Sequence, residues 1–209
     1  MRQYRGCSKL YYAPYNYDAE TNKVSFGELK KFADVKNISV ELVAESEEVW
    51  ADNNLDDITY GGTSATRTFG CTRIDPAIAA DVLGKSTITI GGKTLYGNAP
   101  DASARKYFAF VYLLHDGDAN KPCEVVTAFR GMVNSISQTS NTIDRGTASE
   151  GQEVSVTFAA PDVPWVKTGK AELDISEAFD SKTVTLAEVN KWYKQVVTYD
   201  NAETVLAAN

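Results

Sequence analysis

Seven carboxylates are concentrated in the thirty residues from Asn37 to Thr66, which contain no lysine or arginine. They are Glu41, Glu45, Glu47, Glu48, Asp52, Asp56 and Asp57. The chain has 28 acidic and 21 basic residues and a formal charge of -7, so the 21 acidic and 21 basic residues outside this stretch cancel. Two carboxylates across a sugar cleft could hydrolyse a glycosidic bond if the pKa of one were raised. Nothing in the sequence distinguishes such a pair among the seven, so a solvated acidic surface is the simpler interpretation.

Other catalytic and binding motifs are incomplete. The sequences LGKST (83–87) and GGKT (91–94) resemble the end of a phosphate-binding loop, but each lacks the earlier glycine of that motif. His115 is the only histidine, and a solvated turn with the following Asp-Gly-Asp explains it better than activation of a nucleophile. The same triplet offers too few oxygen ligands for calcium. We therefore predict that the chain is not an enzyme and has no catalytic residue, cofactor or metal site.

The totals favour a globular protein that is made in the cytoplasm and not exported. Cys7, Cys71 and Cys123 are odd in number, far apart and not in CxxC spacing, which indicates reduced thiols. The N-terminus lacks the apolar segment of a signal peptide, and the longest apolar run, residues 107–114, is too short to span a membrane. A pI near 4.8 argues against tight binding to a phosphate backbone.

The acidic stretch begins with a strand pattern. Ile38, Val40, Leu42 and Ala44 alternate with mainly polar residues, which predicts a strand with one face in the core and the other in water. We expect the Gly61-Gly62 dipeptide to interrupt the strands. After it, the alternation of residues typical of a strand resumes.

The remaining elements are predicted from periodicity and turn residues. Helices are expected at residues 76–83, with Asp75 as N-cap and Gly84 as C-cap, and at about 186–197, where Thr185 and Glu188 form a capping-box pattern. Pro14 should end the first strand and begin a long loop at about 14–34. The expected strands are 5–13, 24–26, 35–44, 48–51, 63–74, 107–114, 123–130, 133–143 and 153–159, with a hairpin within 85–105.

This order of short strands without βαβ alternation predicts a mainly β fold, an antiparallel β-sandwich or barrel-like structure with helices at its edges. We expect one domain over residues 1–209, with an extended C-terminal region from about residue 162.

Several segments, taken in order, resemble one structural family. They are RGCSKLYYA, KNISVELVAESEEVWADN, the Gly-Gly dipeptide, DPAIAADVLGK, KYFAFVYLL, EVVTAFRGMV, GQEVSVTFAAP and the late helix. Together they are similar to the major tail protein, or tail tube protein, of long-tailed siphophages, most sharply at VWADN (49–53) and ADVLGK (80–85). Residues 15–34 and 162–183 depart from the family pattern.

The resemblance implies a structural virion protein of the phage tail, assembled in the host cytoplasm. Its β-sandwich with a flanking helix would form hexameric rings, which stack into a hollow tube that conducts DNA during ejection. The implied partners are copies of itself and other tail proteins such as the tape measure, distal tail and terminator proteins. DNA would pass only transiently and without tight binding, and no membrane is involved.

Within such a tube the acidic stretch has two possible positions. Carboxylates that face the lumen would repel DNA phosphates and keep passage fast. Alternatively, the stretch joins rings through ion pairs with basic residues such as Lys30, Lys31, Arg105 or Lys106.

A carbohydrate-binding or adhesion sandwich of a phage tip or cell surface is the alternative function. It would require exposed aromatic side chains clustered on loops, for which Tyr12, Tyr15 and Tyr17 are the candidates.

Overall fold

The computed structural model describes residues 4–51, 54–98, 105–117, 121–138 and 151–207, and for residues 4–5 and 43–63 it describes the backbone only. Along this part of the chain the elements are β1 (Tyr4–Asp18), β2 (Lys23–Phe26), β3 (Lys30–Ala33), β4 (Val35–Ala51), β5 (Asn54–Cys71), α1 (Pro76–Leu83), β6 (Ser86–Ile90), β7 (Lys93–Gly97), β8 (Phe108–Asp116), β9 (Pro122–Gln138), β10 (Gln152–Ala159), β11 (Asp174–Ala178), α2 (Leu186–Lys191) and α3 (Ala202–Ala207).

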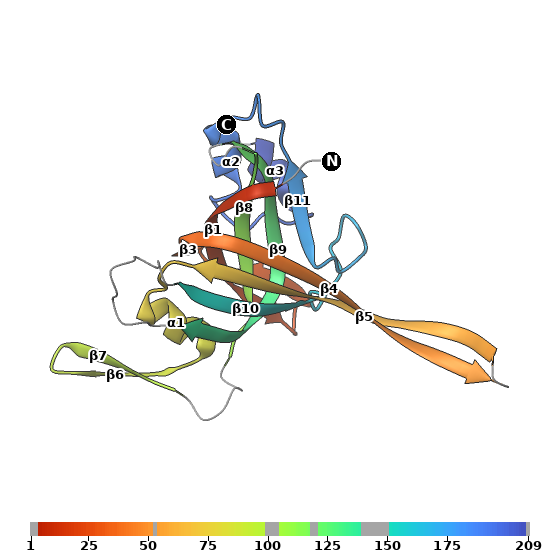
Figure 1. The fold of residues 1–209 in the computed structure, drawn as a ribbon, viewed down its shortest axis with the longest axis horizontal. Helices are drawn as coiled ribbons and strands as arrows, with labels where there is room; N and C mark the ends of the chain where they lie inside the picture. Colours follow the sequence, from red (N-terminus) through yellow and green to blue (C-terminus); the bar gives the residue numbers. More distant parts are fainter. Residues whose placement is uncertain (1–3, 52–53, 99–104, 118–120, 139–150, 208–209) are drawn as a thin grey trace, which may run out of the picture.

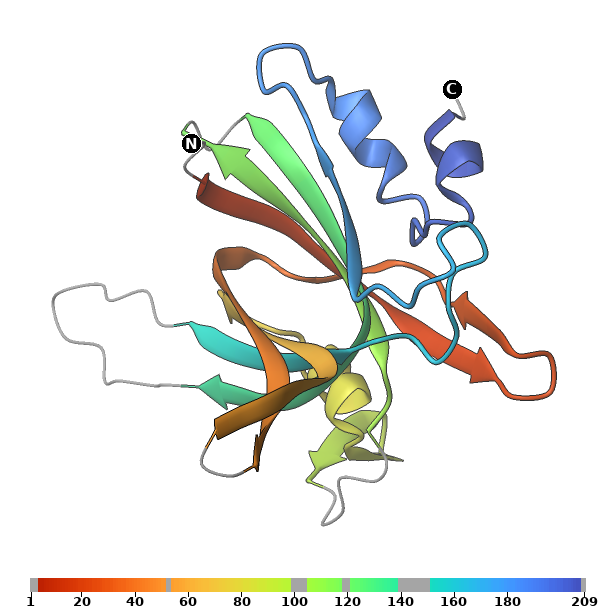
Figure 2. The ribbon, with the colours of Figure 1, turned by 90° about the vertical axis from the view of Figure 1, so that its right-hand side faces the viewer.

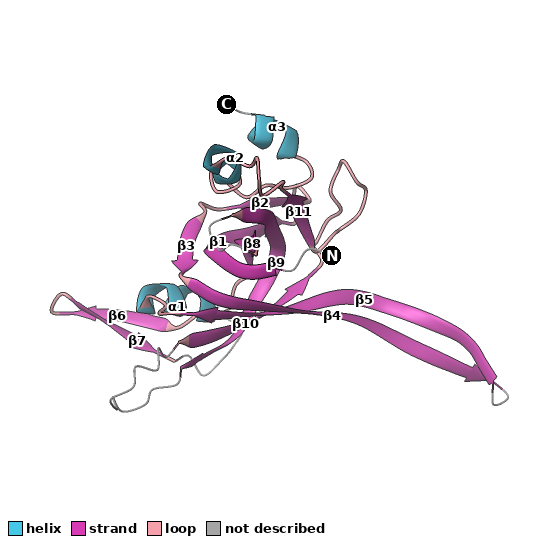
Figure 3. Ribbon diagram, turned by 45° about the horizontal axis from the view of Figure 1, so that its top comes forward, coloured by secondary structure: helices cyan, strands magenta, loops and turns pink. Residues whose placement is uncertain are grey.

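Most of the strands belong to one antiparallel sheet of order β2-β1-β8-β9-β10-β5-β4 (Figure 1). β3 also pairs with β1, β11 also pairs with β9, and β6 and β7 form a separate hairpin. The sheet curls, so strands from its two ends meet: the ring of Phe110 on β8 lies 5.7 Å from Phe69 on β5 and 5.6 Å from Phe32 on β3. The predicted mainly antiparallel β fold is confirmed, as a curled, barrel-like sheet (Figure 3).

The concave side of the curled sheet encloses the inner core. Its large buried members include Leu10, Tyr12, Phe32, Phe69, Val82, Phe108, Phe110, Val154, Val156 and Phe158. α1 packs against this cluster through Ile78, Val82 and Leu83. Burial of each large apolar side chain is worth about 1.5–3 kcal/mol, so this cluster is a main source of the stability of the fold.

The C-terminal part of the chain covers the opposite face of β8 and β9 (Figure 2). Val111 and Leu113 pack there in one buried cluster with Trp192. In a neighbouring cluster the rings of Phe129 and Trp165 lie 4.6 Å apart. β8 is therefore buried on both faces, as its uninterrupted apolar sequence predicts.

The helix predicted at residues 76–83 is confirmed with identical bounds. The side chain of Asp75 accepts a hydrogen bond from the backbone N of Ala77 at 2.8 Å. Gly84 ends the helix at a φ of 63°, in the left-handed region that suits glycine. Both signals act within a few residues, which explains why sequence alone located them.

The predicted strand end at Pro14 and the predicted loop at about 14–34 are wrong. β1 continues to Asp18, and β2 and β3 occupy much of the predicted loop; the short strand predicted at 24–26 is confirmed as part of β2. Pro14 is tolerated inside β1 because alternate amides point to opposite sides of a strand. The N–H of Tyr15 donates to the carbonyl of Tyr107 at 3.0 Å, so the nitrogen of Pro14 points away from that neighbour.

The predicted division of the acidic stretch is also wrong. The strands predicted at 35–44 and 48–51 are one strand, β4, and the glycines at 61–62 lie inside β5. The pairing register shifts between Ala44, opposite Thr63, and Ser46, opposite Tyr60, so β5 has one extra residue there. Such a bulge bends and twists a strand without ending it.

Two further predictions differ from the structure. The strands expected at 123–130 and 133–143 are the single strand β9. The helix expected at 186–197 ends at Lys191, although its predicted capping box is present. Val196 and Val197 then enter two different apolar clusters, and α3 follows separately.

Candidate assembly surfaces

β4 and β5 continue past the curled sheet as a two-stranded arm, defined here as residues 45–51 and 54–60 (Figure 1). Its pairing runs from Ser46 opposite Tyr60 to Ala51 opposite Asn54. Within the described residues no third strand pairs with the arm. Backbone N–H and C=O groups along its outer edges are therefore open to pairing with another chain.

The arm gathers most of the predicted acidic site residues. The residues whose backbones it contains are Glu45, Glu47 and Glu48 on β4 and Asp56 and Asp57 on β5. Glu41 precedes the arm on β4, and its side chain is exposed. Asp52 lies outside the described residues. Whether these carboxylates face a lumen or a ring contact stays a prediction.

The inner face of β4 is open to solvent over part of its length. Ile38, Val40 and Leu42 pair with residues of β5 whose side chains are buried inside the curled sheet. Ile38 is partly buried, but Val40 and Leu42 are 50% and 68% exposed. The prediction that this face lies in the core is wrong for these two residues, because β4 is the last strand of the sheet.

A second exposed apolar surface, on the β6–β7 hairpin, was missed by the sequence analysis. Ile88, Ile90 and Leu95 are 57%, 59% and 52% exposed. Ile88 lies opposite Leu95, and Ile90 lies opposite Lys93, so these four residues share one face of the hairpin. The sequence does contain a signal for this surface: isoleucine alternates with threonine in STITI, and KTLYG, with its leucine, follows directly after the turn residues Gly91-Gly92.

The basic residues proposed as ring partners are mostly engaged within the subunit. Lys30 lies 3.9 Å from Glu28, and Lys31 forms an ion pair with Asp34 at 2.6 Å. Arg105 donates hydrogen bonds to the carbonyls of residues 133 and 134 at 3.2 and 2.8 Å. Lys106 is exposed and remains the best candidate of the four.

The two phosphate-loop look-alikes have other structural roles. The N–H groups of Gly84 and Lys85 donate to carbonyls of α1 at 3.3 and 2.8 Å, so they terminate the helix instead of facing a phosphate. Gly91 and Gly92, with φ of 58° and 76°, form the tip of the β6–β7 hairpin.

His115 is not the solvated turn residue that the sequence predicted. It lies on β8, is 7% exposed, and its Nε2 is hydrogen-bonded to Oγ of Ser8 at 2.7 Å. The strand continues through His115 to Asp116 before the chain turns. The hydrogen bond between Ser8 and His115 therefore links the neighbouring strands β1 and β8.

Cys71 is buried and Cys7 is half-buried, and neither forms a disulfide. Burial raises the pKa of Cys71 to about 12 and also raises that of Cys7, which keeps both thiols protonated and weakly reactive.

Among the described residues no group of three His, Cys, Asp or Glu could hold a metal ion. None of the helices described is long and apolar enough to cross a membrane.

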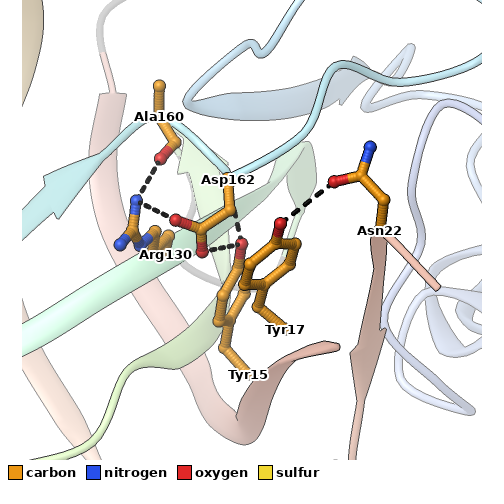
Figure 4. A network of polar contacts seen from close by, with 6 residues as sticks. All are labelled: Tyr15, Tyr17, Asn22, Arg130, Ala160 and Asp162. Atoms are coloured by element: carbon orange, nitrogen blue, oxygen red, sulfur yellow. Dashed lines mark hydrogen bonds and ion pairs between the residues drawn. The ribbon is translucent and has the colours of Figure 1, made fainter. Parts of the chain in front are cut away.

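A polar network attaches the C-terminal region to the sheet (Figure 4). The carboxylate of Asp162 accepts a hydrogen bond from the hydroxyl of Tyr15 at 2.9 Å and pairs with Arg130 at 3.0 Å. Arg130 also donates to the carbonyl of Ala160 at 3.0 Å and lies 4.5 Å from the ring centre of Tyr107. Burial raises the pKa of Tyr15 to about 12, so its hydroxyl remains a donor at neutral pH.

The aromatic cluster expected of a sugar-binding surface is not formed by the predicted residues. Tyr12 and Tyr15 are buried, and only Tyr17 of the three is exposed. The hydroxyl of Tyr17 donates to the side chain of Asn22 at 3.0 Å, across the β1–β2 turn (Figure 4).

No protein-family model matches the sequence, and no curated protein matches it. Three solved structures with a similar fold are the tube-terminating cap of the anti-feeding prophage, the extended sheath–tube complex PVC of an extracellular contractile injection system, and Hcp1 from Salmonella typhimurium. Their identities are 7%, 9% and 8%, with TM-scores of 0.43, 0.38 and 0.34. The matches cover 82%, 82% and 85% of this chain and 89%, 90% and 97% of the other chains. At these values the function has to be inferred from the chain's own surfaces.

Proposed function

We propose that this chain is a structural subunit that polymerises with its own copies into the tube of a phage-type tail. The subunits form stacked, hexameric rings around a channel that conducts DNA during ejection, and the protein has no enzymatic role. It works in the virion tail after assembly in the host cytoplasm. Its other partners are further tail proteins, such as the tape measure, distal tail and terminator proteins, and DNA passes without tight binding.

The observation that best supports this proposal is the projecting arm. Ordering a backbone costs roughly 1–2 kcal/mol per residue, and an isolated two-stranded ribbon recovers little of this cost in water. A partner that pairs with the arm, or packs against it, would supply the missing contacts. A second copy of the chain is such a partner, because the arm and the body of the subunit offer different surfaces that can meet between copies (Figure 1). Contacts between unlike surfaces repeat head to tail and build rings or filaments.

Electron microscopy of the purified protein in negative stain tests the proposal. We expect hollow tubes or stacked rings above a threshold concentration, and single subunits below it. Compact particles at every concentration would reject the tube and favour the adhesion sandwich. A variant in which residues 46–60 are replaced by a two-residue turn should stay monomeric at concentrations where the wild type polymerises.

We further propose that the acidic residues of the arm lie at contacts between copies, whereas Glu41 is the candidate for the lumen. The arm leaves the body of the subunit, which suits contact with a neighbour (Figure 3). Carboxylates this dense repel one another unless cations of another copy face them.

A triple variant, Glu45→Gln, Glu47→Gln and Glu48→Gln, tests this position, with Glu41→Gln as the control. We expect the triple variant to polymerise more weakly and with less salt sensitivity, because it has lost contact ion pairs. Normal polymerisation with a changed lumen potential in a reconstruction would instead place these side chains along the channel.

A further inference from the structure

The β6–β7 hairpin stands away from the rest of the subunit. It forms its own two-stranded sheet, and Figure 1 shows it projecting from the side of the body opposite to the arm. All residues from 86 to 98 are exposed. Even so, one face of the hairpin carries Ile88, Ile90 and Leu95, each more than half exposed.

A hairpin of this kind is poorly stabilised by itself. A single pair of strands is marginally stable in water, and three large aliphatic side chains add an unfavourable apolar surface. Since the hairpin's apolar positions meet across the strands, they form a continuous face that one partner could cover. Within the described residues nothing covers this face, so it is available to a partner outside the subunit.

The same chain offers a complementary surface on β4. Val40 and Leu42 extend the inner core along the last strand of the sheet, next to the partly buried Ile38, but remain 50% and 68% exposed. Within one subunit this surface and the hairpin face are exposed at the same time, so they do not cover each other. Each could therefore cover the corresponding surface of a different copy.

Charge favours the same pairing. Residues 85–98, which contain the hairpin, include Lys85 and Lys93 and no Asp or Glu. Residues 37–66, which contain the open face of β4, include seven carboxylates and no Lys or Arg. Lys93 lies on the apolar face of the hairpin, so this contact would bring a positive charge to a stretch that carries only negative ones. The nearest of these, Glu41, lies between Val40 and Leu42 in sequence but on the other face of β4, so Lys93 would reach it around the open edge of the strand.

We propose that the Ile88–Ile90–Leu95 face of the hairpin of one copy packs on the Val40–Leu42 face of β4 in a second copy. This contact rests on the proposed self-assembly and assigns it a specific pair of surfaces. The two surfaces differ, so the contact is heterologous and propagates from copy to copy.

Polar substitution on the two faces of the hairpin provides the first test. The double variant Ile88→Ser and Leu95→Ser should raise the threshold concentration for polymerisation at least tenfold, which corresponds to about 1.4 kcal/mol. Tyr96→Ser is the matched control, because Tyr96 is a large side chain, 41% exposed, on the opposite face of the same hairpin. It should change the threshold less than twofold. Equal effects of the two variants would overturn the proposal. Because all three side chains are exposed, neither variant should unfold the subunit. The melting temperatures of the monomeric variants should therefore equal that of the wild type.

Disulfide cross-linking separates this contact from self-assembly in general. In a Cys7→Ser background, copies with Leu42→Cys are mixed with copies with Leu95→Cys, assembled and oxidised. Mass spectrometry should find a disulfide between positions 42 and 95, and much less of it when Thr94→Cys, on the opposite face, replaces Leu95→Cys. Tubes without the 42–95 cross-link would refute the hairpin contact and leave the tube proposal standing. A wild type that never polymerises would refute both.

Discussion

Gly131 provides a direct test of how the sheet is packed where β9 passes between β8 and β10. Its register partners are Phe108 and Phe158. A Cβ at this position would lie 2.5 Å from Cε1 of Phe158 and 2.8 Å from Cγ1 of Val156. Both neighbours are fully buried, and Phe158 is held in turn by the ring of Phe110, 5.8 Å away. The inner core therefore has no room for the methyl group of alanine.

We expect Gly131→Ala to lower the free energy of unfolding by roughly 1–2 kcal/mol. Overpacking a filled core costs about 1–3 kcal/mol, and replacing glycine returns about 0.4–1 kcal/mol by restricting the unfolded chain. In a chain of this length each kcal/mol corresponds to about 2–4 °C in Tm, so the expected decrease is about 2–8 °C. Differential scanning calorimetry of the monomer, below the threshold concentration, measures it.

Gly97→Ala is the matched control. Gly97 also lies on a strand, but the nearest atom to its added Cβ is the carbonyl oxygen of Ser86 at 4.0 Å. This variant should be as stable as the wild type or slightly more stable. If Gly131→Ala melts at or above the wild-type temperature while the control behaves as expected, the close contact between β9 and β10 is absent and the packing described for the inner core is wrong.

Three further changes test the helix cap, the polar network and the C-terminal cluster. Asp75→Ala should cost about 1 kcal/mol in a urea titration, because α1 loses its capping hydrogen bond. Burial raises the pKa of Tyr15 to about 12, so the folded state holds the phenol proton more tightly than the unfolded chain. That stabilisation is fully present below about pH 10 and lost as the pH rises through about 12. Cys71 adds to the alkaline loss, so the comparison of Tyr15→Phe with the wild type at several pH values isolates the tyrosine. Trp192→Phe should cost about 1–3 kcal/mol in a thermal melt, because it removes both buried volume and the indole hydrogen bond to Glu177 at 2.7 Å.

The sequence predicts those features whose causes are local. Asp75 and Gly84 bound α1 because each cap is satisfied by groups within one turn. The apolar run of β8 identifies a strand buried on both faces, since few other structures bury such a run. The alternation that begins at Ile38 correctly predicts the first half of β4 as a strand.

Features that depend on distant partners were not predictable in this way. Pro14 and the glycines at 61–62 look like chain breaks, but their neighbours in the sheet accommodate them. Arg67 follows the strand alternation, yet it is buried inside the curled sheet, where its guanidinium pairs with Asp174 of β11 and lies 5.0 Å from the ring centre of Phe158. No pattern around residue 67 indicates a partner more than a hundred positions away.

The candidate assembly surfaces also combine features that the sequence predicts with features that depend on distant partners. The acidic composition of residues 37–66 is visible in the sequence, but the pairing that gathers its residues along one arm depends on the continuation of β4 and β5 beyond the curled sheet. The alternation of Val40 and Leu42 predicts that both are buried, which is wrong, since they are 50% and 68% exposed. Within the described residues, no other part of the chain covers this surface fully.

Exposed apolar strands would ordinarily threaten solubility, and soluble proteins often protect sheet edges with lysine, proline or bulges. In this chain the net charge of -7 comes from residues 37–66, so copies that approach each other with their acidic stretches repel one another. At physiological ionic strength the Debye length is about 8 Å, so this repulsion is weak between bodies that are well separated and strongest near contact. A productive contact must therefore replace local repulsion with local attraction. In the contact we propose, the lysine-bearing hairpin meets the acidic strand and provides that exchange, whereas two acidic strands that meet repel each other. In the proposed polymer, this local charge would disfavour contacts between acidic strands and favour the contact between hairpin and β4.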